Sequence, residues 1–153
     1  MVGSGVHMAT SPDDVESLVS RFLDCRVPRS EWTHNAHLVV GAWHVARFGP
    51  DEAVERLRAG IRRLNESNGV PNSTTDGYHE SVTRAFVTLL DEFLRVFSTD
   101  TSLADRIGAL LRSPLARRNV LMTFYTRETL MSVRARVEWV EPDIRPLGLG
   151  GVD

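Results

Sequence analysis

Apolar residues recur at intervals of three and four along most of this chain, which is the spacing of an amphipathic α-helix. A first helix is predicted from Ser11-Pro12-Asp13-Asp14, a capping serine followed by proline and two acids, to just before Pro28. A second is predicted from a cap at Ser30 to about Phe48, ahead of a Gly-Pro break. Because this second segment is apolar nearly all round between residues 36 and 46, it is the predicted central helix.

The same pattern divides the rest of the chain into further helices joined by turn-rich segments. They are expected at residues 50–68, 78–97, 103–111, 115–124 and 126–140. A polar loop at residues 70–77 precedes the fourth helix, and an irregular Pro- and Gly-rich tail follows the last one. No stretch alternates with the two-residue period of a strand. We therefore predict an all-α, single-domain helical bundle of about six to seven helices over residues 11–153.

Composition indicates an ordinary globular domain. Hydrophobic residues make up 42% of the 153 residues and charged residues 25%, which is enough for one domain to bury a core without disulfides or metals. The first ten residues, MVGSGVHMAT, look like a disordered expression-vector remnant and contain no secretory apolar region. No apolar run is long enough to span a bilayer. We expect a cytoplasmic protein with no membrane partner.

The charged residues and the cysteine count exclude several kinds of chemistry. All 18 basic residues are arginines, because the chain has no lysine. This excludes a lysine Schiff base and a P-loop lysine, so neither pyridoxal phosphate nor a nucleotide cofactor is expected. A net charge of -2 argues against nucleic acid as a partner. The single cysteine, Cys25, excludes an internal disulfide and a CxxC redox pair, and its expected role is in the core.

Histidines outside the N-terminal remnant fall in only two of the predicted helices. His34, His37 and His44 lie on one stripe of the second helix at about 3.6 residues per turn. His79 opens the fourth helix on its core-facing stripe, with Glu80 rotated by about 100 degrees from it. We therefore predict that the four histidines converge on one interior site between these helices, beside Glu80. The assignment of His44 to the site depends only on its position on this stripe, and a core role explains that position equally well.

Three functions fit such a cluster. In the leading hypothesis, His34, His37, His79 and Glu80 hold a divalent metal, Fe, Cu or Zn, that activates oxygen or water for oxidation or hydrolysis of a small polar molecule. The Glu-x-x-His repeat usual in such bundles is missing, however. In the second, His37, His79, Glu80 and Tyr78 are catalytic residues of a metal-free acid–base lyase, cyclase or isomerase. In the third, the histidines are structural and the protein is a non-catalytic binding or interaction protein.

Two residues outside the cluster are predicted to contact the small-molecule substrate. Trp43 is a candidate wall of the pocket or part of the core. Arg134 and Arg136, on the last predicted helix, could bind an anionic substrate through two hydrogen bonds or pair with nearby acids such as Glu138 and Asp143. We assign Trp43 and Arg136 as substrate-binding residues, and an oligomer is compatible with this arrangement.

Several of these residues also form a longer pattern. Trp32-Thr33-His34 with His37-Leu38, followed by Gly77-Tyr78-His79-Glu80, resembles an uncharacterised family of small helical bacterial proteins with THxxHL-like and YHET-like motifs. The stretch from Tyr125 to Leu147 is similar too, so the resemblance covers about residues 15–147. It implies a shared functional pattern that comprises His34, His37, Tyr78, His79 and Glu80, with Arg136 and Asp143 as possible members. The family brings no settled activity with it.

Overall fold

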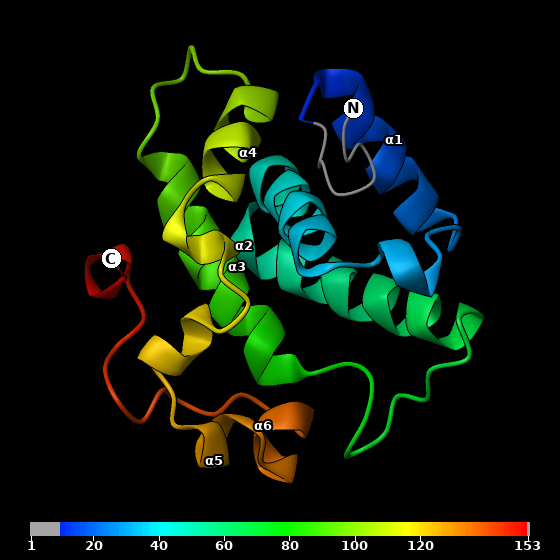
Figure 1. Ribbon diagram of the computed structural model, residues 1–153, viewed down its shortest axis with the longest axis vertical. Coiled ribbons are helices and arrows are strands. Elements are labelled where there is room, and N and C mark those ends of the chain that lie inside the picture. The colour runs from blue at the N-terminus through cyan, green and yellow to red at the C-terminus, as the bar shows by residue number, and fades with distance from the viewer. Residues whose placement is uncertain (1–9, 153) are drawn as a thin grey trace.

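The computed structural model describes residues 10–152 as an all-α chain arranged around one long, bent helix (Figure 1). Its α-helices are α1 (Pro12–Leu23), α2 (His34–Ser67), α3 (Glu80–Arg95), α4 (Leu103–Leu111), α5 (Arg127–Leu130) and α6 (Val133–Val137). Short 3₁₀ turns lie at Arg29–Glu31, Pro114–Ala116, Val120–Thr123 and Leu149–Gly151. No strand occurs between residues 10 and 152, so the predicted all-α bundle is confirmed. The predicted vector remnant lies outside the described residues except for its last residue, Thr10.

Helix α2 joins the second and third predicted helices across a sharp bend. At the bend, Gly49 has φ 81° and ψ 165°, a backbone conformation that glycine adopts without steric cost, and Pro50 begins the second half. The cap of α2 is Thr33, whose hydroxyl accepts a hydrogen bond from the Ala36 amide at 3.2 Å. Ser30, the predicted cap, instead belongs to the 3₁₀ turn that precedes Thr33. The helix therefore begins three residues later than its predicted cap would place it.

The first half of α2 is the centre of the core, as its apolar sequence predicts. Helices α1, α3 and α4 all pack against α2. Close approach of α1 depends on Gly60, because a Cβ there would lie 2.6 Å from the Phe22 ring. Buried residues of the first half of α2 include Ala36, Leu38, Val39, Val40, Ala42 and Val45. None of the helices described between residues 10 and 152 is both long and apolar enough to cross a membrane.

The C-terminal part is less regular than predicted. Residues 115–124 contain two 3₁₀ turns, and residues 126–140 form two short helices, where the sequence pattern predicts one helix in each. Ser132 separates the short helices, because its hydroxyl caps α6 by accepting from the Ala135 amide at 3.1 Å. Asp143 then ties the tail to the start of α5 by accepting from the Thr126 hydroxyl at 2.6 Å. In Figure 1, α6 and the segment after it lie beside the N-terminal end of α3.

Candidate functional site

A cleft of about 510 Å³ opens beside the N-terminal end of α3. Its lining comes from three parts of the chain that are far apart in sequence: the second half of α2, the loop leading into α3 with the first turns of α3, and α6 with the residues after it. It consists of Arg58, Arg62, Asn72, Ser73, Thr74, Tyr78, Glu80, Arg84, Arg136, Val137, Glu138 and Trp139. Four arginines against two glutamates give the lining a positive charge, although the whole chain carries a net charge of -2.

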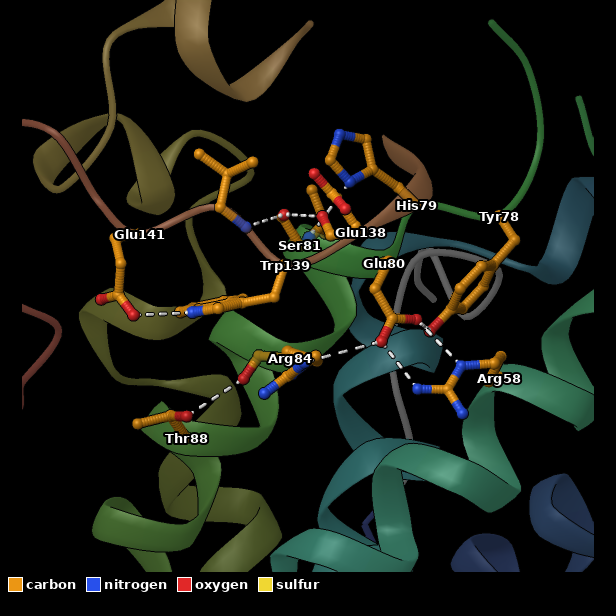
Figure 2. Close-up of polar contacts among 12 residues, drawn as sticks. Arg58, Tyr78, His79, Glu80, Ser81, Arg84, Thr88, Glu138, Trp139 and Glu141 are labelled. Atoms are coloured by element: carbon orange, nitrogen blue, oxygen red, sulfur yellow. Dashed lines mark hydrogen bonds and ion pairs between the residues drawn. The ribbon is translucent and has the colours of Figure 1, made fainter. Parts of the chain in front are cut away.

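Glu80 is the buried acid of this cleft, and both of its oxygens are occupied. Its carboxylate accepts from Arg58 Nε at 2.9 Å and Nη2 at 2.7 Å, and from the Tyr78 hydroxyl at 2.9 Å. Arg58 and Tyr78 lie on one side of the carboxylate and Arg84 on the other, with Arg84 Nη1 4.0 Å away (Figure 2). Burial alone would raise the pKa of Glu80, but hydrogen bonds from Arg58 and Tyr78 outweigh it and lower the pKa.

The Tyr78 hydroxyl is the neutral hydrogen-bond donor to the Glu80 carboxylate. Burial raises the pKa of Tyr78, so the hydroxyl stays protonated and donates a hydrogen bond to the ionised Glu80 carboxylate. The two pKa values are therefore shifted away from neutral pH in opposite directions. Glu80 and Tyr78 are therefore better suited to hold the Arg58 guanidinium in place than to exchange protons with a ligand.

His79 is next to Glu80 in the sequence, but its ring points away from the Glu80 carboxylate (Figure 2). His79 is the N-cap of α3, with extended backbone at φ -131° and ψ 110°, so this helix begins at Glu80, two residues after its predicted start near Tyr78. Nδ1 accepts from the Val82 amide at 3.1 Å, which leaves the ring proton on Nε2 to donate to the Leu130 carbonyl at 2.8 Å. Burial lowers the pKa of His79, in agreement with this neutral form.

Two histidines of α2 contact segments other than the cleft. His34 Nε2 lies 3.3 Å from the carbonyl of Leu115, which belongs to the 3₁₀ turn after α4. His37 Nδ1 donates to the Thr33 carbonyl at 2.8 Å, and its ring packs on Trp32 with 3.9 Å between centroids. Crowding by protein atoms lowers the pKa of His37, although the residue keeps a solvent-exposed edge. Neither imidazole faces the Glu80 carboxylate closely enough to bond to it.

His44 and Trp43 lie on the α1 side of α2. His44 is buried, and its Nδ1 donates to the Val40 carbonyl at 2.8 Å while its ring packs edge-on against Phe22. The Trp43 indole donates to the Glu16 carboxylate of α1 at 3.0 Å. Trp43 is not part of the cleft lining, so this contact gives it a role in holding α1 on α2.

The described side chains do not gather the four histidines around one point. Between residues 10 and 152, no three or more His, Cys, Asp or Glu side chains form a group that could hold a metal ion. Both ring nitrogens of His79 bond to the backbone, and the Glu80 oxygens bond to Arg58 and Tyr78. Joint binding of an ion would require these side chains to change conformation. The metal centre therefore stays a prediction from the sequence.

Two arginines on separate elements help to shape the cleft. Arg136 Nη1 donates to the Gly77 carbonyl at 2.8 Å and lies 3.4 Å from the Tyr78 carbonyl, so it joins α6 to the loop before α3. Arg84 lies against the Trp139 indole, with its guanidinium carbon 5.0 Å from the ring centroid (Figure 2). Cation–π contact of this kind keeps Arg84 beside the wall of the cleft.

Ser81 fastens the far wall of the cleft to α3. Its fully buried hydroxyl donates to the Glu138 carbonyl at 2.8 Å and accepts from the Val140 amide at 3.0 Å. Sequence reasoning missed this residue as well as three arginines and a tryptophan of the lining, namely Arg58, Arg62, Arg84 and Trp139. The i, i+4 spacing of Arg58 and Arg62 was the available signal, but many exposed arginine pairs share it.

No family model, curated protein or solved structure matches this chain. The resemblance based on the THxxHL-like and YHET-like segments therefore stays a prediction.

Proposed function

We propose that this protein binds a small polar anion in the cleft between α2, α3 and the segment after α6. The observation that supports this proposal is the excess of guanidinium groups over carboxylates in the lining. Arg58 is neutralised by Glu80, whereas the Arg62 side chain has no ion-pair or hydrogen-bond partner among the described residues. Guanidinium groups bind oxyanions through paired hydrogen bonds, so an anion would supply the charge that this lining lacks.

Neutral groups of the loop before α3 extend the same site. Asn72, Ser73 and Thr74 bring amide and hydroxyl groups to the lining. The Asn72 side chain fixes this loop, because it donates to the Arg62 carbonyl at 3.0 Å and accepts from the Tyr78 amide at 3.0 Å. Val137 and Trp139 add apolar surface on the opposite wall. Such a mixture suits a small molecule with an anionic group and a short carbon body.

Binding is better supported than proton transfer by the groups in this cleft. Glu80 has a lowered pKa and Tyr78 a raised one, so neither is suited to exchange protons near neutral pH. An acid–base enzyme would need the ligand to release Tyr78 or His79 from its present partners. A metal-dependent oxidase or hydrolase would need His34, His37, His79 and Glu80 to regroup. Both enzymatic hypotheses stay predictions from the sequence.

Calorimetric titration of acetate and of sulfate at low ionic strength tests the proposal. We expect at least one of these anions to bind, and Arg62→Gln to weaken that binding by about tenfold through loss of one charge-assisted contact. Arg63→Gln is the matched control, because Arg63 is an exposed neighbour on α2 that is not part of the lining. Absence of binding by both anions, or equal effects of the two substitutions, would overturn the proposal.

A further inference from the structure

The charges of the cleft define its ligand more narrowly. We propose that the ligand carries two negative charges on one compact group, as a phosphate monoester does, and that this group binds among Arg62, Arg84 and Arg136. This inference rests on the proposed function, because it concerns the same cleft. The proposed function requires only an anion, whereas here the charge and the shape of the bound group are specified.

Both acids of the lining already have arginine partners. Glu80 makes a two-point contact with Arg58. Glu138 accepts from Arg134 Nε at 2.8 Å, and Arg134 lies outside the lining. The hydrogen bonds of both acids therefore go to Arg58 and Arg134, and the other arginines receive only a longer ion pair, 4.0 Å between Arg84 Nη1 and Glu80. Three guanidinium groups of the lining remain without a carboxylate in hydrogen-bonding contact: Arg62, Arg84 and Arg136.

Two of these three cations make their shortest contacts with uncharged groups. Arg84 lies against the Trp139 ring and is 4.0 Å from an oxygen of Glu80, which is already bonded to Arg58. Arg136 donates to the backbone carbonyl of Gly77, which carries a dipole and no net charge. Because these contacts restrict the side chains, the cations lose little conformational freedom when a ligand binds. Arg84 and Arg136 are therefore in position before the ligand arrives, and the positive charge of the site is only partly compensated, through the 4.0 Å ion pair of Arg84 with Glu80.

The guanidinium groups of Arg62, Arg84 and Arg136 repel one another, and a ligand with one negative charge would offset only part of this repulsion. A group with two charges offsets more of it, and a tetrahedral oxyanion presents oxygens in several directions to guanidinium groups on α2, α3 and α6. Neutral donors from Ser73 and Thr74 can bind its remaining oxygens. A cleft of about 510 Å³ lies in the usual range for small-molecule pockets and exceeds the size of one such group. The dianion is thus expected to be the head of a larger molecule.

Methyl phosphate and methyl sulfate separate charge from shape, because both are tetrahedral esters of similar size. Methyl phosphate is mostly a dianion near pH 7.5 and a monoanion near pH 5, with a second pKa of about 6, whereas methyl sulfate stays a monoanion. Near pH 7.5 we expect methyl phosphate to bind at least about tenfold more tightly, the effect of one additional charge-assisted contact. Near pH 5 this ratio is expected to approach about one, and comparing ratios cancels changes in the protein itself.

Two variants and a third probe test whether the arginines cause the preference for methyl phosphate over methyl sulfate. Arg84→Gln is expected to reduce the ratio near neutral pH, whereas Arg95→Gln, an exposed position further along α3, leaves it unchanged. Succinate, with its two charges on separate groups, is expected to bind more weakly than methyl phosphate. Equal affinities for the two esters near pH 7.5, or tighter binding of succinate, would overturn this inference. In those cases anions still bind and the proposed function stands, whereas failure of every probe to bind overturns both.

Discussion

The Glu80 carboxylate and the Arg58 guanidinium meet in a two-point contact, with Nε–Oε1 and Nη2–Oε2 distances of 2.9 and 2.7 Å. The contact joins the second half of α2 to the first turn of α3 across the polar loop at residues 70–77. Because it neutralises Arg58, the positive charge of the cleft depends on the other arginines. The pair therefore has a positioning role: it holds two walls of the cleft together and leaves the ligand to groups around it.

Glu80→Gln should lower the free energy of unfolding by about 1–3 kcal/mol, because it weakens hydrogen bonds to a charged group and leaves a buried site imperfectly paired. The matched control is Glu52→Gln, which removes an exposed i, i+4 pair with Arg56. Its effect should stay within about 0.5 kcal/mol. Urea unfolding of the two variants measures both values. Equal losses would show that the Glu80–Arg58 contact is no stronger than a surface pair.

Ser81→Ala should loosen the wall that carries Trp139. The substitution removes one hydroxyl that serves two backbone partners, so we expect a loss of about 1–2 kcal/mol in unfolding free energy. Hydrogen exchange at the Val140 amide should become faster, since that amide loses its acceptor. Ser20→Ala, at an exposed position of α1, is the control and should leave both quantities nearly unchanged. Unaltered exchange at Val140 in Ser81→Ala would contradict the anchoring role.

Stability should fall on mild acidification because of the histidines. Burial lowers the pKa of three histidines below the usual 6.5, namely His34, His44 and His79. As pH falls through about 6.5, the unfolded chain takes up protons before the folded protein, so this stabilisation is full above that pH and is lost below it. The Tm measured by calorimetry should therefore decrease from about pH 7.5 to about pH 5, above the range in which most carboxylates titrate.

His79→Asn tests how much of this decrease in stability is due to His79 alone. Asparagine is a good N-cap, so the start of α3 should be preserved while the titrating ring is removed. The variant should lose less stability than the wild type over the same pH interval. A decrease in Tm as steep as that of the wild type would mean that protonation of His79 does not disrupt the cap.

Chelation should leave anion binding by the cleft unchanged, because guanidinium groups and loop donors are the proposed ligands of the anion. Elemental analysis before and after treatment with a chelator, with sulfate affinity measured on both samples, tests this expectation. The alternative outcome is a stoichiometric metal that is lost in both His37→Ala and His79→Ala. That outcome would favour the metal centre predicted from the sequence over the arginine-lined cleft.

The helical architecture follows from sequence features that act locally. Apolar periodicity requires no knowledge of the tertiary structure. The Ser11 cap is confirmed, and the break predicted at Gly49-Pro50 is a sharp bend within α2. The same reasoning failed where a side chain competes with the helix backbone. Ser132 divides the last predicted helix, and His79 caps α3 with its own ring nitrogen. Serine is a familiar cap, whereas a capping histidine has no distinct sequence signature.

The histidine site was predicted on shared helical position, which does not determine where a ring bonds. His37 and His44 each donate to the backbone carbonyl four residues earlier, so these nitrogens are satisfied by the local backbone. The arginine cleft could not be read from periodicity either. Exposed arginines occur throughout the chain, and only the packing of α6 against α3 brings Arg136 and Arg84 into one lining. Sequence reasoning included Arg136, Tyr78 and Glu80 but gave the histidines the larger role.

Mapping the anion site by backbone amide NMR is the most direct test of the cleft. Sulfate added at low ionic strength should shift amides at residues 72–74, 78–84 and 136–139 most strongly, with much weaker changes in the same segments for Arg62→Gln. Shifts that are largest elsewhere, such as at the basic pair 117–118, or that are equal in wild type and Arg62→Gln, would contradict anion binding at this site.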